Sequence, residues 1–596
     1  MSSPHTVTAT PTDELHHPSV GRRMRKALPI YAALSPYFFF FLVFAAIPMI
    51  FTLLLAFTDW SGLGSAHFVG LENFTYLISD HLFYKSLGTT LILWAMGTIP
   101  TLIIATIVAL MLNKTMRFST TYRVIYLVPN ITSMVAMGIL FSSIFSSQFG
   151  LANAVRNLLG QENIAWLQNE WGIKIAISSL TVWSFVGYNA LLILAGLQAI
   201  DKTQYEAAAI DGANGWQTFF HVTLPQLRAI VLFITLMSTI GSLQSFTEAQ
   251  VLTSSQSAGA ASAGGVNNSG LTMVLYFYSV AFQENRYGYG ATIAWGVFVV
   301  VLFFSIINWL VTREHDRKVA RRRRVHIGAF FRHLFLILGG LISLFPFYWM
   351  FVLASRPSSV IYKYPPVLTP GNRLGENVHT ITDKVNIWAA MANTALVATT
   401  VSVLVLLISS LAAFAFAKFD FPGRNVLFVI VLATFLLPTQ LATIPQFVLM
   451  SKIGWVGDLK AVIVPSLASS FGVFWLRQYA TNAIPKELLE AATLDGCGFW
   501  HQYVHVCLPI IRPAMAFLGI FTFIGSWNDF MWPLIVLNDP SKLTLQVALS
   551  QLKTAHGTDY GMLMASSLIA VVPLLVVFVI GAKQLIAGIS EGAVKS

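Results

Sequence analysis

The chain has 596 residues, of which 56% are hydrophobic and only 10% are charged, and its mean hydropathy is +0.69. Soluble domains average about 45–50% apolar and about 25% charged residues, so this composition excludes an ordinary soluble protein and indicates an integral membrane protein. The net charge of +11 comes from basic residues that flank apolar segments, which indicates membrane orientation and not nucleic-acid binding. The two cysteines, Cys497 and Cys507, exclude a disulfide framework or a cysteine metal cluster.

Long apolar segments predict about twelve transmembrane helices, because a membrane-spanning helix requires about 20 mostly apolar residues. The fold class we expect is therefore an all-α integral membrane protein; the segments are too long and continuous for a β-barrel. The expected spans in the first half of the chain are 28–57, 86–112, 124–145, 173–197, 229–252 and 291–311. Those in the second half are 328–354, 392–417, 426–450, 461–480, 514–537 and 562–586.

Basic residues predict the orientation of these spans in a cell membrane, the cytoplasmic or inner one. The basic positions before the first span, between the second and third, after the sixth, and between the eighth and ninth all fall on one side. Because cytoplasmic loops are rich in Lys and Arg, we expect both termini to be cytoplasmic. The loop 355–391 carries four basic residues on the other side, which a long loop tolerates. The N-terminus shows no apolar stretch followed by a cleavage site, so we expect no cleaved signal.

One phrase of twenty residues occurs twice: EAAAIDGANGWQTFFHVTLP at 206–225 and EAATLDGCGFWHQYVHVCLP at 490–509. The offset that carries position 206 to position 490 also aligns GSLQSF at 241–246 with GSWNDF at 525–530. Matched segments at one offset indicate a duplicated unit, hence two homologous six-helix halves. The expected organisation is a cytoplasmic tail at 1–27, a first six-helix unit at 28–312, a basic linker at 313–326 and a second six-helix unit at 327–596.

Each phrase predicts two short helices in a cytoplasmic loop. Asp201 with Gln204 resembles a capping box, and Gly212 and Gly496 stand where helices commonly end in a left-handed residue. A single such loop has two readings, an amphipathic connector on the membrane surface or a docking surface for a partner. The duplication favours docking, as do the acidic residues, which an anionic membrane surface would repel.

The pattern Glu-Ala-Ala, then Gly six residues after the Glu, then Leu-Pro, resembles the coupling loop (EAA motif) of ABC-importer permeases. The chain is most similar to the carbohydrate class, typified by the two membrane subunits of the maltose transporter, here fused. The resemblance implies that each loop docks in a groove of a separate ABC ATPase, that two ATPase subunits bind, and that an extracytoplasmic solute-binding protein delivers a sugar. It assigns ATPase docking to Glu206, Ala207, Ala208, Gly212, Glu490, Ala491, Ala492 and Gly496.

The same resemblance assigns a solute pathway to the first half of the chain. The positions are Tyr188, Asn189, Ser238, Ser242, Gln244 and Ser245. Hydroxyl and amide groups suit the hydrogen-bonding pattern of a sugar, and an aromatic ring stacks on its face. The alternative is that small residues simply let membrane helices pack closely. The family has amides where this chain has Ser242 and Ser245, which leaves the identity of the solute open.

We therefore expect a permease for a sugar or oligosaccharide and not an enzyme, with no catalytic residue and no metal site. The sequence contains no Gly-Lys dipeptide and hence no phosphate-binding G-x-x-x-x-G-K-[ST] loop. ATP and Mg²⁺ would be used by the partner ATPases, this chain would bind no cofactor, and membrane lipid would surround it. Two alternatives remain open: a twelve-helix secondary transporter, and an ABC permease for a non-sugar solute such as a glycerophosphate.

Overall fold

A computed structural model describes residues 20–114, 117–254, 263–313, 329–556 and 559–594. Its secondary structure is helical apart from one antiparallel hairpin, in which β1 (Thr58–Asp59) pairs with β2 (His67–Phe68). Most of the predicted tail 1–27 and of the basic linker 313–326 lies outside the described residues. The all-α fold class is confirmed.

The helices of the first half of the chain alternate between long apolar helices and short connectors. They are α1 (Val20–Phe41), α2 (Ile47–Leu55), α3 (Glu72–Ser79), α4 (His81–Leu112), α5 (Ser119–Ile131), α6 (Met134–Ile144), α7 (Leu151–Leu158), α8 (Glu170–Ala199), α9 (Lys202–Ile210), α10 (Gly215–Thr218), α11 (Leu224–Leu243), α12 (Thr247–Thr253), α13 (Met273–Tyr278) and α14 (Tyr287–Arg313). A π-helical segment joins α1 to α2, so the two form one continuous span.

The second half repeats this alternation. Its helices are α15 (Ala329–Ala354), α16 (Ser358–Ile361), α17 (Leu374–Lys384), α18 (Ile387–Lys418), α19 (Arg424–Ala433), α20 (Gln440–Lys452), α21 (Lys460–Ile463), α22 (Ser470–Ala483), α23 (Lys486–Leu494), α24 (Phe499–Gln502), α25 (Leu508–Asn528), α26 (Met531–Val536), α27 (Leu545–His556) and α28 (Tyr560–Val594). Short 3₁₀ and π segments lie between several of them.

Among the described residues, eight continuous helices are long and apolar enough to cross a membrane, and two bent pairs bring the number to ten. The bent pairs are α5 with α6, at 92°, and the helix that ends at Arg228 with Ile230–Leu243, at 56°. The other two predicted spans are corrected: 426–450 and 461–480 are not single helices. The first is divided into α19, a 3₁₀ turn and α20, and the second into α21, a 3₁₀ turn and α22. Pro438 and Pro465 lie at these breaks, and each removes a helical hydrogen bond.

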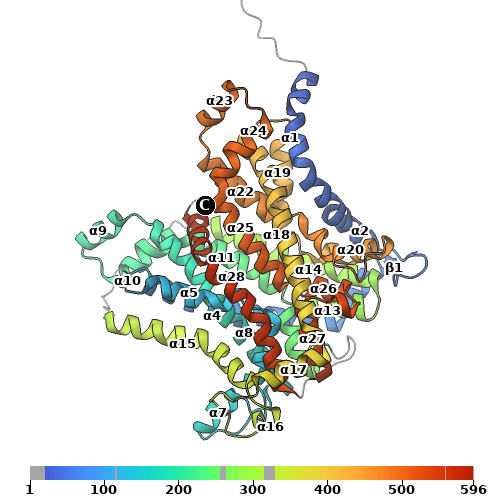
Figure 1. The fold of residues 1–596 in the computed structure, drawn as a ribbon, viewed down its shortest axis with the longest axis vertical. Helices are drawn as coiled ribbons and strands as arrows, with labels where there is room; N and C mark the ends of the chain where they lie inside the picture. Colours follow the sequence, from blue (N-terminus) through green and yellow to red (C-terminus); the bar gives the residue numbers. More distant parts are fainter. Residues whose placement is uncertain (1–19, 115–116, 255–262, 314–328, 557–558, 595–596) are drawn as a thin grey trace, which may run out of the picture.

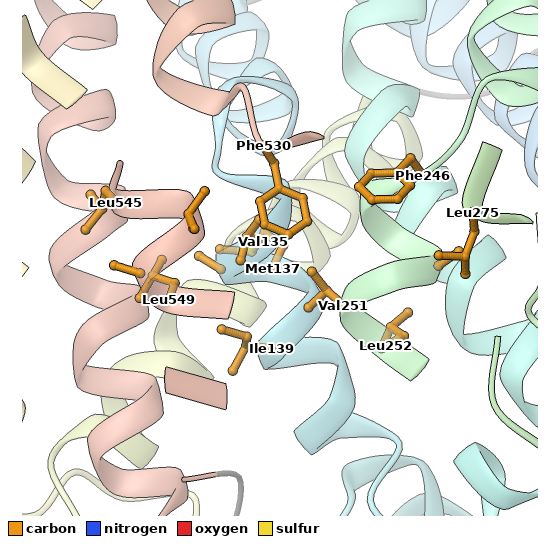
Figure 2. Packing of buried hydrophobic residues seen from close by; sticks show 14 of the residues in the cluster. Val135, Met137, Ile139, Phe246, Val251, Leu252, Leu275, Phe530, Leu545 and Leu549 are labelled. Carbon is orange, nitrogen blue, oxygen red and sulfur yellow. The ribbon is translucent and has the colours of Figure 1, made fainter. Parts of the chain in front are cut away.

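The two halves share one buried apolar core. The largest cluster of buried side chains contains residues from both halves, including Phe246 after α11 and Phe530 after α25 (Figure 2). These two phenylalanines occupy matched positions at the offset of the repeated phrase, and their ring centroids are 5.9 Å apart. Equivalent residues of the two halves therefore meet in the core, as they do at the axis of a pseudo-symmetric pair.

The connectors divide between two sides of the molecule (Figure 1). Figure 1 shows α23 and α24 at the top, where α1 begins beside α24, and α9 and α10 at the left. At the bottom and right lie α7, α16, α17 and β1. The repeated phrases are thus on the same side, away from the hairpin.

Candidate functional site

The two repeated phrases fold into the same local structure. In the first, α9 is followed by α10, a π-helical segment at Phe219–Thr223 and then α11. In the second, α23 is followed by α24, a π-helical segment at Tyr503–Cys507 and then α25. Each element of the second loop begins the same number of residues after its counterpart in the first loop, and this number is the offset between the two repeated phrases. The predicted pair of short helices is confirmed, and the duplication extends to the irregular π segments.

The same glycine turn ends the first helix of each loop. Gly212 has a φ of +72° and Gly496 has a φ of +80°, in the left-handed region that glycine adopts without a steric cost. The amide of Gly212 donates to the carbonyl of Ala209 at 3.1 Å, and that of Ala213 to Ala208 at 2.8 Å. The amides of residues 496 and 497 repeat both bonds at 3.1 and 2.9 Å. This is the Schellman pattern, which satisfies the terminal carbonyls of a helix.

Each loop presents the same exposed surface. Glu206 and Glu490 are exposed, and no hydrogen bond or ion pair holds either carboxylate among the residues that the structure describes. The following Ala207 and Ala491 are exposed as well, and Ala208 and Ala492 are half-buried.

An apolar side chain completes that surface in both loops. Ile210 is 87% exposed and Leu494 is 89% exposed, each four residues after the glutamate and so on the same helical face. Sequence analysis did not single out this pair. The signal was present, since both are bulky apolar residues at the matched position of an otherwise polar helix.

Polar contacts hold the first loop against the body. The side chain of Asp201 caps α9 by accepting from the Thr203 amide at 2.9 Å, which lowers the pKa of Asp201. The predicted capping-box partner, Gln204, instead accepts from Gln226 at 2.9 Å. The Tyr205 hydroxyl accepts from Thr223 at 3.4 Å.

An apolar cluster holds the second loop. Leu489 of α23 is 9% exposed and packs with Phe414 of α18, Ile484 and Tyr503. The Gln502 amide donates to Thr493 at 2.9 Å and to the Cys497 carbonyl at 3.0 Å. The second loop is therefore anchored to a long membrane helix of its own half.

The predicted solute-pathway residues lie on two helices, and hydrogen bonds do not join the two groups. Tyr188 and Asn189 are on α8, where Asn189 is buried. The polar positions from Ser238 to Ser245 lie on α11 and in the break that follows it, and Gln244 is the residue after the last turn. The described residues provide no hydrogen bond between these serines and Tyr188 or Asn189.

Two of the serines have partners of their own. Ser242 is 3.2 Å from the Thr98 hydroxyl of α4, and Ser245 donates to Glu248 at 3.1 Å. These contacts agree with close helix packing, and the pathway assignment stays a prediction.

The fold and the matched loops define a duplicated, multi-pass α-helical membrane protein with two equivalent surfaces on one side. Comparison with known families identifies its class. Residues 101–325 and 405–589 both match the family of binding-protein-dependent transport system inner membrane components. The chain belongs to this family and carries its domain twice, which confirms the resemblance to ABC-importer permeases.

Individual relatives each align with less than half of the chain. The arabinooligosaccharide transport permease AraQ of Halalkalibacterium halodurans is 34% identical over 43% of this chain and 92% of its own length. Its AraP counterpart is 32% identical over 48% and 88%. The lactose transport permease LacF of Rhizobium radiobacter is 34% identical over 46% and 90%.

A solved structure is also similar. It is a bacterial ABC transporter involved in the import of the acidic polysaccharide alginate. The identity is 21%, with a TM-score of 0.43 over 49% of this chain and 98% of that chain.

Proposed function

We propose that this chain is the membrane-spanning permease of an ATP-driven importer for a sugar or oligosaccharide. Family membership supports the role of an inner membrane component in binding-protein-dependent transport. Relatives named for arabinooligosaccharides and lactose support a carbohydrate solute. A relative named for sn-glycerol-3-phosphate, 29% identical, favours the alternative of a glycerophosphate. No pathway position in this chain is basic, which favours a neutral sugar over a phosphate.

The two matched loop surfaces carry the proposal that two separate ATPase subunits bind, one to each loop. Water solvates the exposed glutamate well, but the almost fully exposed Ile or Leu one turn later leaves apolar surface in water. The arrangement is a favourable one in an interface, where the apolar side chain is buried and the carboxylate pairs with a basic residue. The surface occurs twice, at matched positions and on one side of the molecule (Figure 1).

The proposed orientation places both loops and both termini in the cytoplasm, in the inner membrane. The start of α1, the loops α9–α10 and α23–α24 and the end of α28 lie toward one side of Figure 1. The basic residues between the predicted spans favour the same side. An external binding protein would then reach the side of the hairpin, α7 and α16, and deliver the solute there.

Purification of the tagged chain in mild detergent, followed by native mass spectrometry, tests this function. We expect one copy of the chain with two ATPase subunits. We also expect uptake that requires ATP and the external binding protein. The chain alone, with uptake driven by a proton or sodium gradient and insensitive to ATP depletion, would support the secondary transporter instead.

A further inference from the structure

A helix of the second half, α27, carries two buried polar side chains that reach into the first half. Gln546 is fully buried and Lys553 is 4% exposed. They are seven residues apart, about two helical turns, and so lie on one face of α27. Lysine is rarely buried this fully unless a partner satisfies it. Each side chain has a partner at the end of a helix in the other half.

Gln546 fixes the start of α6. Its side-chain oxygen accepts from the Ser133 hydroxyl at 2.5 Å, and its nitrogen donates to the Trp527 carbonyl at 3.1 Å. Ser133 is the N-cap of α6 and accepts from the Ala136 amide at 3.2 Å. The glutamine therefore orients the hydroxyl that satisfies the first turn of α6.

Lys553 fixes the end of α12. Its ammonium group donates to the carbonyl of Val251, one of the last carbonyls of α12, which lack a backbone partner within the helix. The same carbonyl also accepts from the hydroxyl of the C-cap residue, Ser254, at 3.2 Å. A cation at the C-terminus of a helix is favourable because the helix dipole is negative there. No ion pair joins Lys553 to a carboxylate in the described part of the chain. Among the described residues, the end of α12 is thus the partner of this buried charge.

The two first-half helices that Gln546 and Lys553 bond, α6 and α12, form one packed unit. α6 and α12 lie so close that a Cβ atom added at Gly138 would be 2.8 Å from a methyl group of Val251. Figure 2 shows Val251 beside α6, with Leu545 and Leu549 of α27 on the other side of α6. Holding the start of α6 and the end of α12 therefore holds the whole unit.

The matching helix of the first half has no such contact. The amide at the start of α13 donates to Thr90 at 3.0 Å, and the amide at the start of α27 donates to Thr394 at 2.8 Å. This pairs Met273 with Leu545, and continuing the alignment without a gap places Val274 at Gln546 and Ala281 at Lys553. The fold accommodates apolar residues at both positions, so the polar pair is an addition of the second half.

We propose that Gln546 and Lys553 form a latch between the two halves, on the side away from α9 and α23. They are positioning residues that keep this side closed until the ATP-driven cycle separates the halves and breaks both contacts. This role rests on the proposed function. The latch therefore sets how often the transporter opens, and hydrolyses ATP, without a loaded binding protein.

Hydrogen exchange on the full chain in lipid nanodiscs tests the latch without any partner. We expect exchange of the α12 amides to rise roughly tenfold in Lys553→Met, about 1.4 kcal/mol. Gln546→Val, which installs the residue of the first half, should do the same for the first turn of α6. Lys542→Met and Gln551→Leu, at exposed positions near and on α27, are the controls and should change neither helix.

Unchanged exchange in α6 and α12 would overturn the proposal. So would an equal rise in α8, since that would report general destabilisation. Should Lys553→Met fail to fold, Gln546→Val decides the question.

A second arm uses the complex with its ATPases. We expect the ATPase rate without binding protein to rise several-fold in both variants and its stimulation by loaded binding protein to fall. A substitution that only damages the structure would lower the ATPase rate both without and with loaded binding protein. That result would contradict the latch. A chain that recruits no ATPase would contradict the proposed function, while exchange in α6 and α12 would still decide the latch.

Discussion

The two loops that share a sequence phrase also share a backbone, but the body of the protein supports them differently. Helix by helix and turn by turn, α9–α10 and α23–α24 correspond at the offset of the repeated phrase. In the second loop Leu489 lies in an apolar cluster with α18. At the matched position of the first loop stands Tyr205, half-buried and hydrogen-bonded through its hydroxyl.

The difference separates the residues that form the loop from those that support it. Both loops retain the turn glycine, the glutamate and the exposed apolar residue, whereas the supporting contacts have diverged. Apolar burial stabilises more strongly than exposed polar contacts. We therefore expect the second loop to be the more rigid one, with the same docking surface on each.

The largest effect is expected from removing both carboxylates, with Glu206→Ala and Glu490→Ala together. Because each is an exposed group without a partner among the described residues, folding should be unchanged while ATP-driven uptake falls by about tenfold or more, as for loss of a charged interface contact. Uptake into vesicles that contain the whole complex is the measurement. Each single variant should show whether the loops contribute equally.

Glu487→Ala is the matched control for the double variant, since Glu487 is also exposed and lies on the same helix, α23. It should leave uptake unchanged. Normal uptake in the double variant would remove the basis for docking through these carboxylates.

Truncation of the supporting side chains tests the difference itself. Leu489→Ala should cost about 2–3 kcal/mol of local stability by leaving a cavity in the cluster with Phe414 and Tyr503. Hydrogen exchange in α23 should then accelerate by roughly thirtyfold or more. Tyr205→Ala should accelerate exchange in α9 by less than about tenfold, because it removes one long hydrogen bond and a half-buried ring. Equal acceleration in the two helices would mean that their supports are equivalent after all.

The glycine turns should respond alike. Gly212→Ala and Gly496→Ala each place a side chain at positive φ, where the space around the new Cβ is open, so only backbone strain of about 1–2 kcal/mol is added. Hydrogen exchange in the last turns of α9 and α23 should rise by similar factors. Gly498→Ala is the control, since Gly498 has equally open space and a φ of −76°. Unequal responses would show that the supports also influence the turns.

The sequence predicted what local patterns determine: the duplicated loops, the glycine turns and most of the long apolar helices. It missed contacts between distant segments. Nothing near Leu489 in the sequence shows that Phe414 of α18 lies beside it, and nothing near Ser242 shows that Thr98 does. The spans 426–450 and 461–480 are a different case. Pro438 and Pro465 are visible in the sequence, but the prediction gave more weight to the apolar composition around them than to the breaks that prolines cause.

The smallest effect on hydrogen exchange is expected at the start of α9. A side chain caps this helix, whereas no side chain caps α23, its counterpart in the second loop. Asp201→Ala removes the acceptor for the Thr203 amide and should raise exchange in the first turn of α9 by about fivefold or less. Asp201→Asn keeps an acceptor and should restore most of the protection, whereas Pro485→Ala at the matched position should change nothing, because Pro485 makes no side-chain cap.

The lowered pKa of Asp201 gives the sign of the pH effect. The stabilisation by the charged cap is fully present above the ordinary aspartate pKa of about 3.9 and is lost as the pH falls through the lower pKa of the folded state. Protection in α9 that increases on acidification would contradict this cap.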